Sequence, residues 1–203
     1  MGLRRVVISG LGALTPIGND VNTLWASLVD GVSGAGPITR FNAEKFKTKF
    51  ACEVKGYDPL NFFDKKEVRK YDLFSQFGIV AADEAINDSG FKQGNYNPER
   101  VGVIWASGIG GIMTLTEEIR AYVTGDGTPR FSPFFIPKMI SDITSGHIAI
   151  KHGFMTEFFY CFSLCFICEC HSRCFQQHSK RKGRYHYYRW VGGFHKRSRN
   201  RWV

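Results

Sequence analysis

The feature that most constrains this chain is a change in sequence character near residue 155. Residues 1–150 contain 16 Lys and Arg against 16 Asp and Glu, whereas residues 151–203 contain 11 against 2. The formal net charge of +9 therefore belongs to residues 151–203 alone, where five of the six cysteines also lie. Because the overall basicity describes only this tail, it does not indicate the function of the preceding residues.

The first 150 residues have the composition of an intracellular globular segment. The apolar run that ends at Ile8 is followed at once by glycines and is too short for a secretory signal. No run approaches the ~20 apolar residues that a membrane-spanning helix needs. Cys52 is the single cysteine before residue 151, a usage typical of reducing compartments. We therefore expect a cytoplasmic protein without disulfides or a membrane partner.

Short apolar runs alternate with helical patterns along this segment. Buried strands are predicted at residues 4–10 and 101–106, where β-branched residues cluster and glycine closes or follows the run. Amphipathic spacing predicts helices at 21–29 and 112–123, and a shorter one at 140–150. Strands separated by helices favour a mostly parallel, helix-covered sheet, so the fold class is α/β.

The intervening segments carry their own signals. Residues 74–86 are apolar nearly all round and predict a core helix that ends at Asp88-Ser89-Gly90. Residues 37–64 predict a loop-rich excursion whose aromatic rings pin it to the rest of the protein. Residues 132–137 predict a rigid, aromatic-rich loop because prolines flank its phenylalanines.

Residues 107–111, Ser-Gly-Ile-Gly-Gly, follow the second predicted strand and permit three interpretations. They can cradle a phosphate, although the full dinucleotide fingerprint and the P-loop lysine are both missing. The glycines can instead allow the backbone to pass close to another element. The segment can also line a substrate site. Elsewhere, the cluster of Lys65, Lys66, Arg69 and Lys70 indicates a solvated helix face, and His147 indicates a structural histidine.

The tail contains two further patterns. Four thiols and two imidazoles between Cys165 and His178 could ligate zinc, but their spacing is crowded rather than divided into two pairs. The basic run 180–184, followed by aromatic residues, could bind nucleic acid through phosphate contacts and base stacking. One simpler hypothesis, given below, explains both patterns without a metal or a nucleic-acid partner.

Five stretches in order carry a family resemblance. They are RRVVISGLGALTPIGNDV at 4–21, ITRFNAEKFKTKFACEVKGYDP at 38–59, DKKEVRKYDLFSQFGIVAADEAINDSG at 64–90, ERVGVIWASGIGG at 99–111 and SPFFIPKMISDITSGHIAIKHGF at 132–154. With them, residues 1–155 resemble the N-terminal part of a bacterial β-ketoacyl-[acyl-carrier-protein] synthase of type II. The resemblance implies an incomplete N-terminal half of a thiolase-like fold, with a mixed sheet covered by helices.

The resemblance also implies an activity and its partners. Members of this family act as homodimers in fatty-acid synthesis. A cysteine takes an acyl chain from acyl carrier protein as a thioester; malonyl-acyl carrier protein then loses CO₂ and attacks it, aided by two histidines. No cofactor or metal takes part. We accordingly expect a decarboxylating acyltransferase family, with no nucleic-acid partner.

Four residues match the family's acyl-chain site. Ile109 matches the side chain that gates the acyl pocket, and Phe134, Phe135 and Ile136 match the loop that lines it and reaches the partner subunit. An apolar gate between glycines suits this task, because glycines permit movement and isoleucine shields a thioester from water. At 105–106, Trp and Ala replace the small apolar and glycine residues that the family pattern predicts.

After Met155 the family pattern fails. The family places a strand there, then a helix whose N-terminus carries the nucleophilic cysteine, a position that lowers a thiol pKa. Suitable codons for Glu157–Cys165 and onward, read from their second base, yield the family's nucleophile segment PNFSTVSACASSANA. Codons for Gly183–Gly193 likewise yield ADIIITGGSEA. We therefore predict two parts: a truncated synthase domain at 1–155, and an out-of-frame tail at 156–203 without a defined fold.

This hypothesis leaves no catalytic residue in the chain. Cys165 lies within one residue of the expected nucleophile but has neither the small neighbours nor the helix, and the two histidines are missing. The predicted function is thus an inactive fragment of a condensing enzyme. The alternative is a small protein with a zinc- or nucleic-acid-binding tail. A chain-length factor would also keep the fold without the nucleophile, but it predicts an in-frame C-terminal half, which residues 156–203 do not supply.

Overall fold

The computed structural model describes residues 7–91, 95–155 and 159–162. Its helices are α1 (Val21–Val29), α2 (Lys65–Lys70), α3 (Leu73–Asp88), α4 (Ile112–Thr124), α5 (Phe135–Met139) and α6 (Ile143–His152), with 3₁₀ turns η1 (Pro59–Asn61) and η2 (Pro98–Arg100). Its strands are β1 (Ala35–Pro37), β2 (Phe50–Cys52), β3 (Ile104–Ser107) and β4 (Phe159–Phe162).

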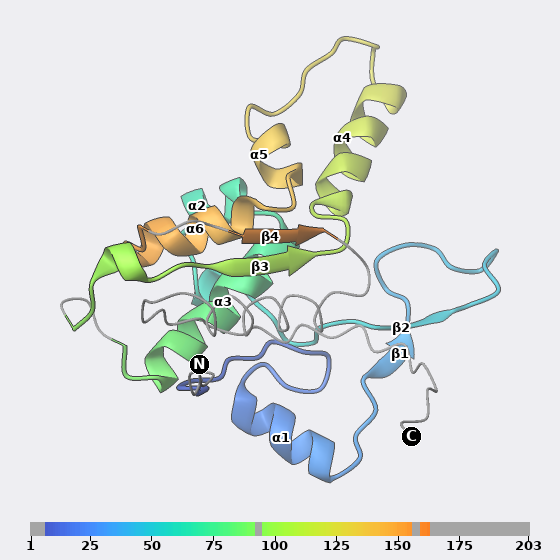
Figure 1. Ribbon diagram of the computed structural model, residues 1–203. Coiled ribbons are helices and arrows are strands. Elements are labelled where there is room, and N and C mark those ends of the chain that lie inside the picture. Colours follow the sequence, from blue (N-terminus) through green and yellow to red (C-terminus); the bar gives the residue numbers. More distant parts are fainter. Residues whose placement is uncertain (1–6, 92–94, 156–158, 163–203) are drawn as a thin grey trace, which may run out of the picture.

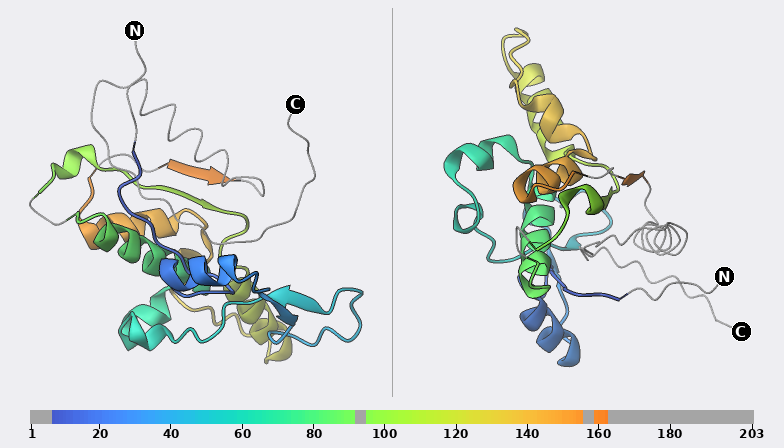
Figure 2. Two further views of the ribbon diagram at one scale, coloured as in Figure 1. Left: turned by 90° about the horizontal axis from the view of Figure 1, so that it is seen from below. Right: turned by 60° about the vertical axis from the view of Figure 1, so that its left-hand side comes forward.

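The long helix α3 is the centre of the described part of the chain (Figure 1). It packs against α6, and α6 packs in turn against β3. The helices α4 and α5 form an arm that projects away from this core, and α1 lies at the opposite end (Figures 1 and 2). The predicted core helix is confirmed, because α3 buries residues on several sides, among them Ile79, Ala81 and Ala85.

Within the described residues, the strands form two separate pairs. The strands β3 and β4 are parallel, with Ile104 opposite Phe159 and Ser107 opposite Phe162. The chain between them passes through α4, α5 and α6, which is the helical crossover that a parallel pair requires. The strands β1 and β2 form an antiparallel pair, with Ala35 opposite Cys52. A parallel pair is therefore found, although the partner of β3 is β4 rather than the strand predicted at 4–10, and a small hairpin lies beside it inside the segment predicted as loop.

The predicted N-terminal strand is wrong for the residues that the structure describes. Residues 7–10 form no strand, and Val7 and Ile8 are 68% and 60% exposed. Acidic side chains of α3 bind the following backbone instead. Leu11 N donates to Asp88 Oδ2 at 2.9 Å, and Ala13 N donates to Glu84 Oε2 at 2.8 Å. These carboxylates satisfy backbone groups that a sheet ladder would otherwise pair.

Two predicted boundaries also need correction. The segment 132–137 is not wholly a loop, because Phe135 begins the short helix α5. Pro137 is its third residue, and the first turn of a helix needs no backbone N–H from that position. The helix predicted from 140 begins at Ile143 instead, since Ile140 has an extended backbone (ψ 126°) that ends α5.

One strand lies in the tail, where the sequence predicted no defined fold. The strand β4 lies at Phe159–Phe162, in the range for which the sequence predicted neither a family strand nor a defined fold, so that expectation is corrected for these four residues. Apart from this strand, the tail from 156 onward lies outside the described residues. No helix among the described residues has both the length and the apolar character needed to cross a membrane.

Candidate functional site

The glycine-rich turn after β3 is packed tightly against the end of α5. Gly111 N donates a hydrogen bond to Met139 O at 3.1 Å. A Cβ added to Gly110 would lie 2.5 Å from Met139 O, and one added to Gly111 would lie 2.3 Å from Lys138 O. Gly110 also has φ +80°, which other residues rarely adopt. The interpretation that these glycines allow a close approach of two backbones is therefore confirmed.

This turn is held internally as well. The Ser107 hydroxyl, at the end of β3, accepts a hydrogen bond from Gly110 N at 3.0 Å. The intervening Ile109 is 62% exposed, so its side chain projects from a braced backbone. A rigid turn that presents one apolar side chain suits the recognition of an apolar ligand.

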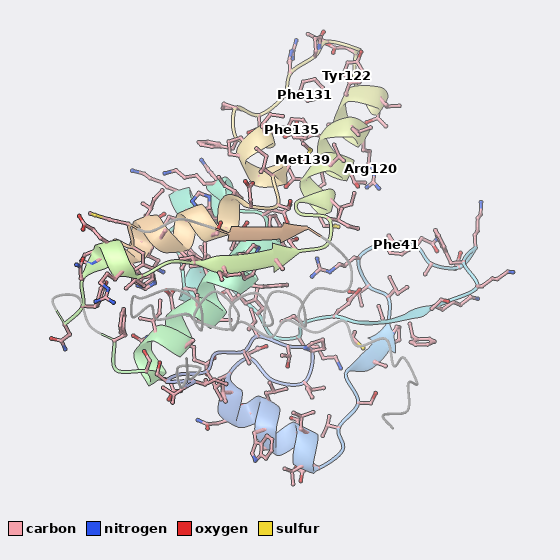
Figure 3. The ribbon with its side chains drawn as sticks, viewed as in Figure 1. Phe41, Arg120, Tyr122, Phe131, Phe135 and Met139 are labelled. Atoms are coloured by element: carbon pink, nitrogen blue, oxygen red, sulfur yellow. The ribbon has the colours of Figure 1, made fainter. Side chains whose placement is uncertain are left out.

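Aromatic side chains form a partly exposed cluster between α4, α5 and the loop that joins them. Tyr122 and Phe131 lie with ring centroids 5.9 Å apart, and Phe131 stacks on Phe135 at 5.7 Å with 22° between the planes. Figure 3 shows these three rings in the arm, with Met139 nearer its base. Such pairs stabilise a small cluster beyond the area that they bury.

The structure brings the four predicted site residues into one region but does not enclose them. The turn of Ile109 and the helix of Phe135 and Ile136 meet through the bond between Gly111 and Met139. Phe135 is half-buried in its aromatic stack, while Phe134 is 39% exposed and Ile136 is 52% exposed. The region is thus an open apolar surface, and the roles of the four residues stay predictions.

Sequence reasoning missed residues that shape this region. Phe131 and Tyr122 belong to its aromatic cluster, and the density of rings around 131–135 was the available signal. Asp72 and Thr114 join α3 to α4 through buried hydrogen bonds. Asp72 directly precedes a helical apolar run, which indicates a helix cap, but nothing in the sequence indicates its bond to a residue 42 positions away.

His147 has a structural environment, as predicted. Its ring lies 4.5 Å from that of Tyr71. Burial, and secondarily the charge of Lys70, lower the pKa of His147 below its usual value. The basic residues of α2 are exposed, so the predicted solvated helix face is confirmed for the free chain.

Metal ligation gains no support from the described residues, which contain no group of three His, Cys, Asp or Glu side chains placed to hold an ion. Cys52 is a free cysteine that is exposed on β2. The candidate zinc ligands between Cys165 and His178 lie outside the described residues, as does the basic run 180–184. The zinc and nucleic-acid hypotheses for the tail therefore stay untested.

A comparison with known protein families matches most of this chain. The model of the family "Beta-ketoacyl synthase, N-terminal domain" matches residues 3–165. The chain belongs to the β-ketoacyl synthase family. The match runs past Met155 and includes β4, so the family pattern continues for ten residues beyond the predicted break.

Curated relatives of this β-ketoacyl synthase chain match about three-quarters of its length. It is 45% identical over 152 residues to the 3-oxoacyl-[acyl-carrier-protein] synthase 2 of Coxiella burnetii, covering 75% of this chain and 36% of the relative. It is 42% identical over 150 residues to the protein of that name from Synechocystis sp., covering 74% and 36%. The predicted resemblance to the N-terminal part of a type II synthase is confirmed. The chain spans about 36% of the length of these relatives.

Solved structures confirm the thiolase-like fold class. The chain is similar to the ishigamide ketosynthase/chain length factor, with a TM-score of 0.69 and 25% identity over 80% of this chain and 40% of that one. It is also similar to a β-ketoacyl synthase from Burkholderia phymatum, with a TM-score of 0.62 and 20% identity over 77% and 39%. A type II polyketide ketosynthase in complex with its acyl-carrier protein gives 0.61 and 23% over 76% and 41%.

Proposed function

We propose that this β-ketoacyl synthase chain supplies one wall of an acyl-chain site. The intact gene product would be a 3-oxoacyl-[acyl-carrier-protein] synthase that condenses acyl thioesters with malonyl-acyl carrier protein in fatty-acid elongation. The names of the relatives support this reaction. The observation that carries the proposal is the bond from Gly111 N to Met139 O, which joins the turn of Ile109 to the helix of Phe135 and Ile136.

The chemistry of this region suits an acyl chain. Ile109, Phe134 and Ile136 present apolar side chains to solvent. Exposed apolar surface of this kind marks a site where a ligand or another protein surface binds. In the proposed synthase, such a wall binds the hydrocarbon chain and excludes water from the thioester, which protects it from hydrolysis. Each methylene buried there contributes about 0.8 kcal/mol of binding free energy.

We also propose that a polypeptide of these 203 residues performs no condensation. Within the five family-like stretches quoted above, between residues 4 and 154, no side chain carries over as the nucleophile or as either catalytic histidine. Cys165 is the nearest thiol to the expected position, and it lacks the small-residue context. Acyl carrier protein as donor and a second copy of the chain as partner are proposed for the intact enzyme; the acyl-carrier-protein complex of a related ketosynthase supports the former.

Binding of acyl pantetheine thioesters of 8, 12 and 16 carbons tests the acyl-chain wall. We expect affinity to rise with chain length and Ile109→Ser to weaken binding of the longest probe about tenfold, equivalent to ~1.4 kcal/mol. Ile150→Ser is the matched control, because Ile150 is 81% exposed on α6. Equal losses in the two variants, or no dependence on chain length, would contradict the proposal.

The frameshift hypothesis for the tail has a separate test. Sequencing the locus around the codon for Met155 should show a small deletion or insertion, and close homologues should encode the nucleophile segment in frame. Purified protein should then hold no stoichiometric zinc, whereas the zinc-tail alternative predicts about one tightly bound ion whose removal unfolds the tail. An intact reading frame that encodes the same tail in close homologues would refute the frameshift.

A further inference from the structure

One buried carboxylate caps two helices. Asp72 is the N-cap of α3, where its Oδ1 accepts a hydrogen bond from Phe74 N at 3.3 Å. Its other oxygen, Oδ2, accepts hydrogen bonds from the backbone N and the hydroxyl of Thr114, the N–H at 3.2 Å. Thr114 is the third residue of α4, the position whose N–H a capping side chain normally satisfies.

The helix α4 lacks a cap of its own. Its N-cap residue is Gly111, which makes no side-chain hydrogen bond. Asp72 therefore supplies from another helix the acceptor that serine, threonine or aspartate would supply locally. The glycine is required at 111 by the close approach to Lys138 O. The two requirements are met together because the cap comes from α3.

The bond is buried at both ends, since Asp72 is 6% and Thr114 is 7% exposed. A hydrogen bond to a carboxylate that is shielded from water is strong and directional. Loss of either partner would leave the other buried without an acceptor or a donor. The link between α3 and α4 is thus a defined joint rather than a loose packing contact.

This joint lies next to the turn that carries Ile109. The turn is attached to the arm through Gly111 and Met139, and Thr114 follows Gly111 by three residues. Asp72 belongs to the core helix, so it connects the far side of the turn to the core. The backbone of Ile109 is consequently held between two attachments with different partners.

We propose that Asp72 is a positioning residue, which sets the orientation of the Ile109 turn relative to the core by capping α3 and α4 at once. Its effect on acyl-chain recognition rests on the function proposed above. The role requires a carboxylate, because an asparagine has one acceptor oxygen and a donating amide group and can serve only one of the two helices.

Amide hydrogen exchange tests the joint directly in the full chain. In Asp72→Asn we expect amides of the first turn of α4 and of 108–111 to exchange about fivefold faster, the factor that corresponds to losing one helix cap. Thr114→Val removes only the hydroxyl contact and should speed exchange in the same segment, and Thr114→Ser should restore the wild-type rate.

Thr144→Val is the matched control. Thr144 is a fully buried threonine whose hydroxyl also bonds to α3, at 2.8 Å from Ser75 Oγ, but it belongs to α6. This variant should lower stability comparably and leave exchange at 108–114 unchanged relative to the rest of the core. The proposal would be overturned if Thr114→Val and Thr144→Val changed amide exchange at 108–114 equally, or if Thr114→Val did not change it.

Acyl probe binding provides the second readout. Thr114→Val should reduce the difference in affinity between the 8- and 16-carbon thioesters at least twofold, while Thr144→Val should not. If wild-type protein binds no acyl probe, the proposed function fails, yet the exchange experiment still decides whether Asp72 positions the turn. If probes bind and chain-length dependence is the same in both variants, the positioning role in recognition is refuted.

Discussion

The indole of Trp105 lies directly against the backbone of Gly78. A Cβ built on Gly78 would lie 2.2 Å from Cη2 of Trp105 and 2.9 Å from Cγ2 of Thr144. Trp105 is 5% exposed on β3, and Gly78 is buried in the middle of α3. The bulky residue that departs from the family pattern therefore fits because the facing helix has no side chain at this point.

Gly78→Ala should destabilise the protein although alanine favours helices. The added methyl group overlaps the indole, and overpacking of this kind costs about 1–3 kcal/mol, more than the ~1 kcal/mol gained in helix propensity. Urea-induced unfolding measures the net change. Gly146→Ala is the control, because its Cβ would meet no atom within 4 Å, and it should stabilise or leave unchanged the helix α6. Equal stability of the two variants would contradict the proposed overlap.

Glu84 should be important for the attachment of the N-terminal segment. Its Oε2 accepts from Ala13 N and its Oε1 accepts from Val21 N, both at 2.8 Å, so one carboxylate joins the loop and the start of α1 to α3. Glu84→Gln replaces one acceptor with a donor and should lower the free energy of unfolding by about 1–3 kcal/mol. Exchange of amides 11–24 should rise with it.

Glu117→Gln, at an exposed site on α4, is the comparison for charge alone. It should change neither the stability by more than about 0.5 kcal/mol nor the exchange of the N-terminal segment. If Glu84→Gln behaves like this variant, the carboxylate does not hold the segment.

We expect the protein to lose stability in mild acid because His147 is partly buried. Burial first, and then the Lys70 charge, lower its pKa below the usual value near 6.5, so the unfolded chain binds a proton more readily than the folded one. The neutral form's contribution is complete above about pH 6.5 and decreases as pH falls from there toward the lower folded-state pKa. Urea midpoints between pH 7.5 and 5 measure this loss.

His147→Phe retains a ring against Tyr71 and should flatten this pH dependence. His152→Gln should keep it, because the second histidine lies beside Asp83, with Nε2 2.8 Å from Oδ1, and away from Tyr71. If the pH dependence of the urea midpoint disappears in His152→Gln and persists in His147→Phe, the prediction for His147 is wrong.

We expect copies of this chain to associate through the outer face of α1. Trp25, Leu28 and Val29 are 68%, 55% and 69% exposed, and α1 buries no residue. Exposed apolar patches of this kind promote contacts between molecules. Light scattering should show particle size rising with protein concentration, and Trp25→Arg with Leu28→Glu should suppress the rise. Asn22→Arg with Ser27→Glu makes the same charge changes without removing apolar area and should suppress it less.

Local signals in the sequence predicted the helices α1, α3 and α4 close to their observed bounds. Asp20 and Asp72 precede apolar runs and cap α1 and α3, and signals of this kind can be read from sequence because capping and helical periodicity depend on residues only a few positions apart. The glycine-rich turn was also predicted, and its close approach to another backbone was among the interpretations. The identity of that backbone, the end of α5, was not predictable without the fold.

Interactions between distant residues account for most of the differences. Residues 7–10 have a strand-like composition, but α3 offers carboxylates to the backbone that follows, and this competition depends on tertiary structure. The double cap at Asp72 has the same origin, since its second partner is Thr114. The strand β4 shows that pairing with β3 can define a short strand where the composition predicted none.

The position of the arm determines whether the two pieces of a chain cleaved at its tip would stay together. Gly125, Asp126 and Gly127 lie exposed at its tip, where α4 ends. A protease that nicks the chain there would leave α4 anchored through Thr114 and the later segment anchored through α6. The two pieces should migrate together on a sizing column and separate only in denaturant.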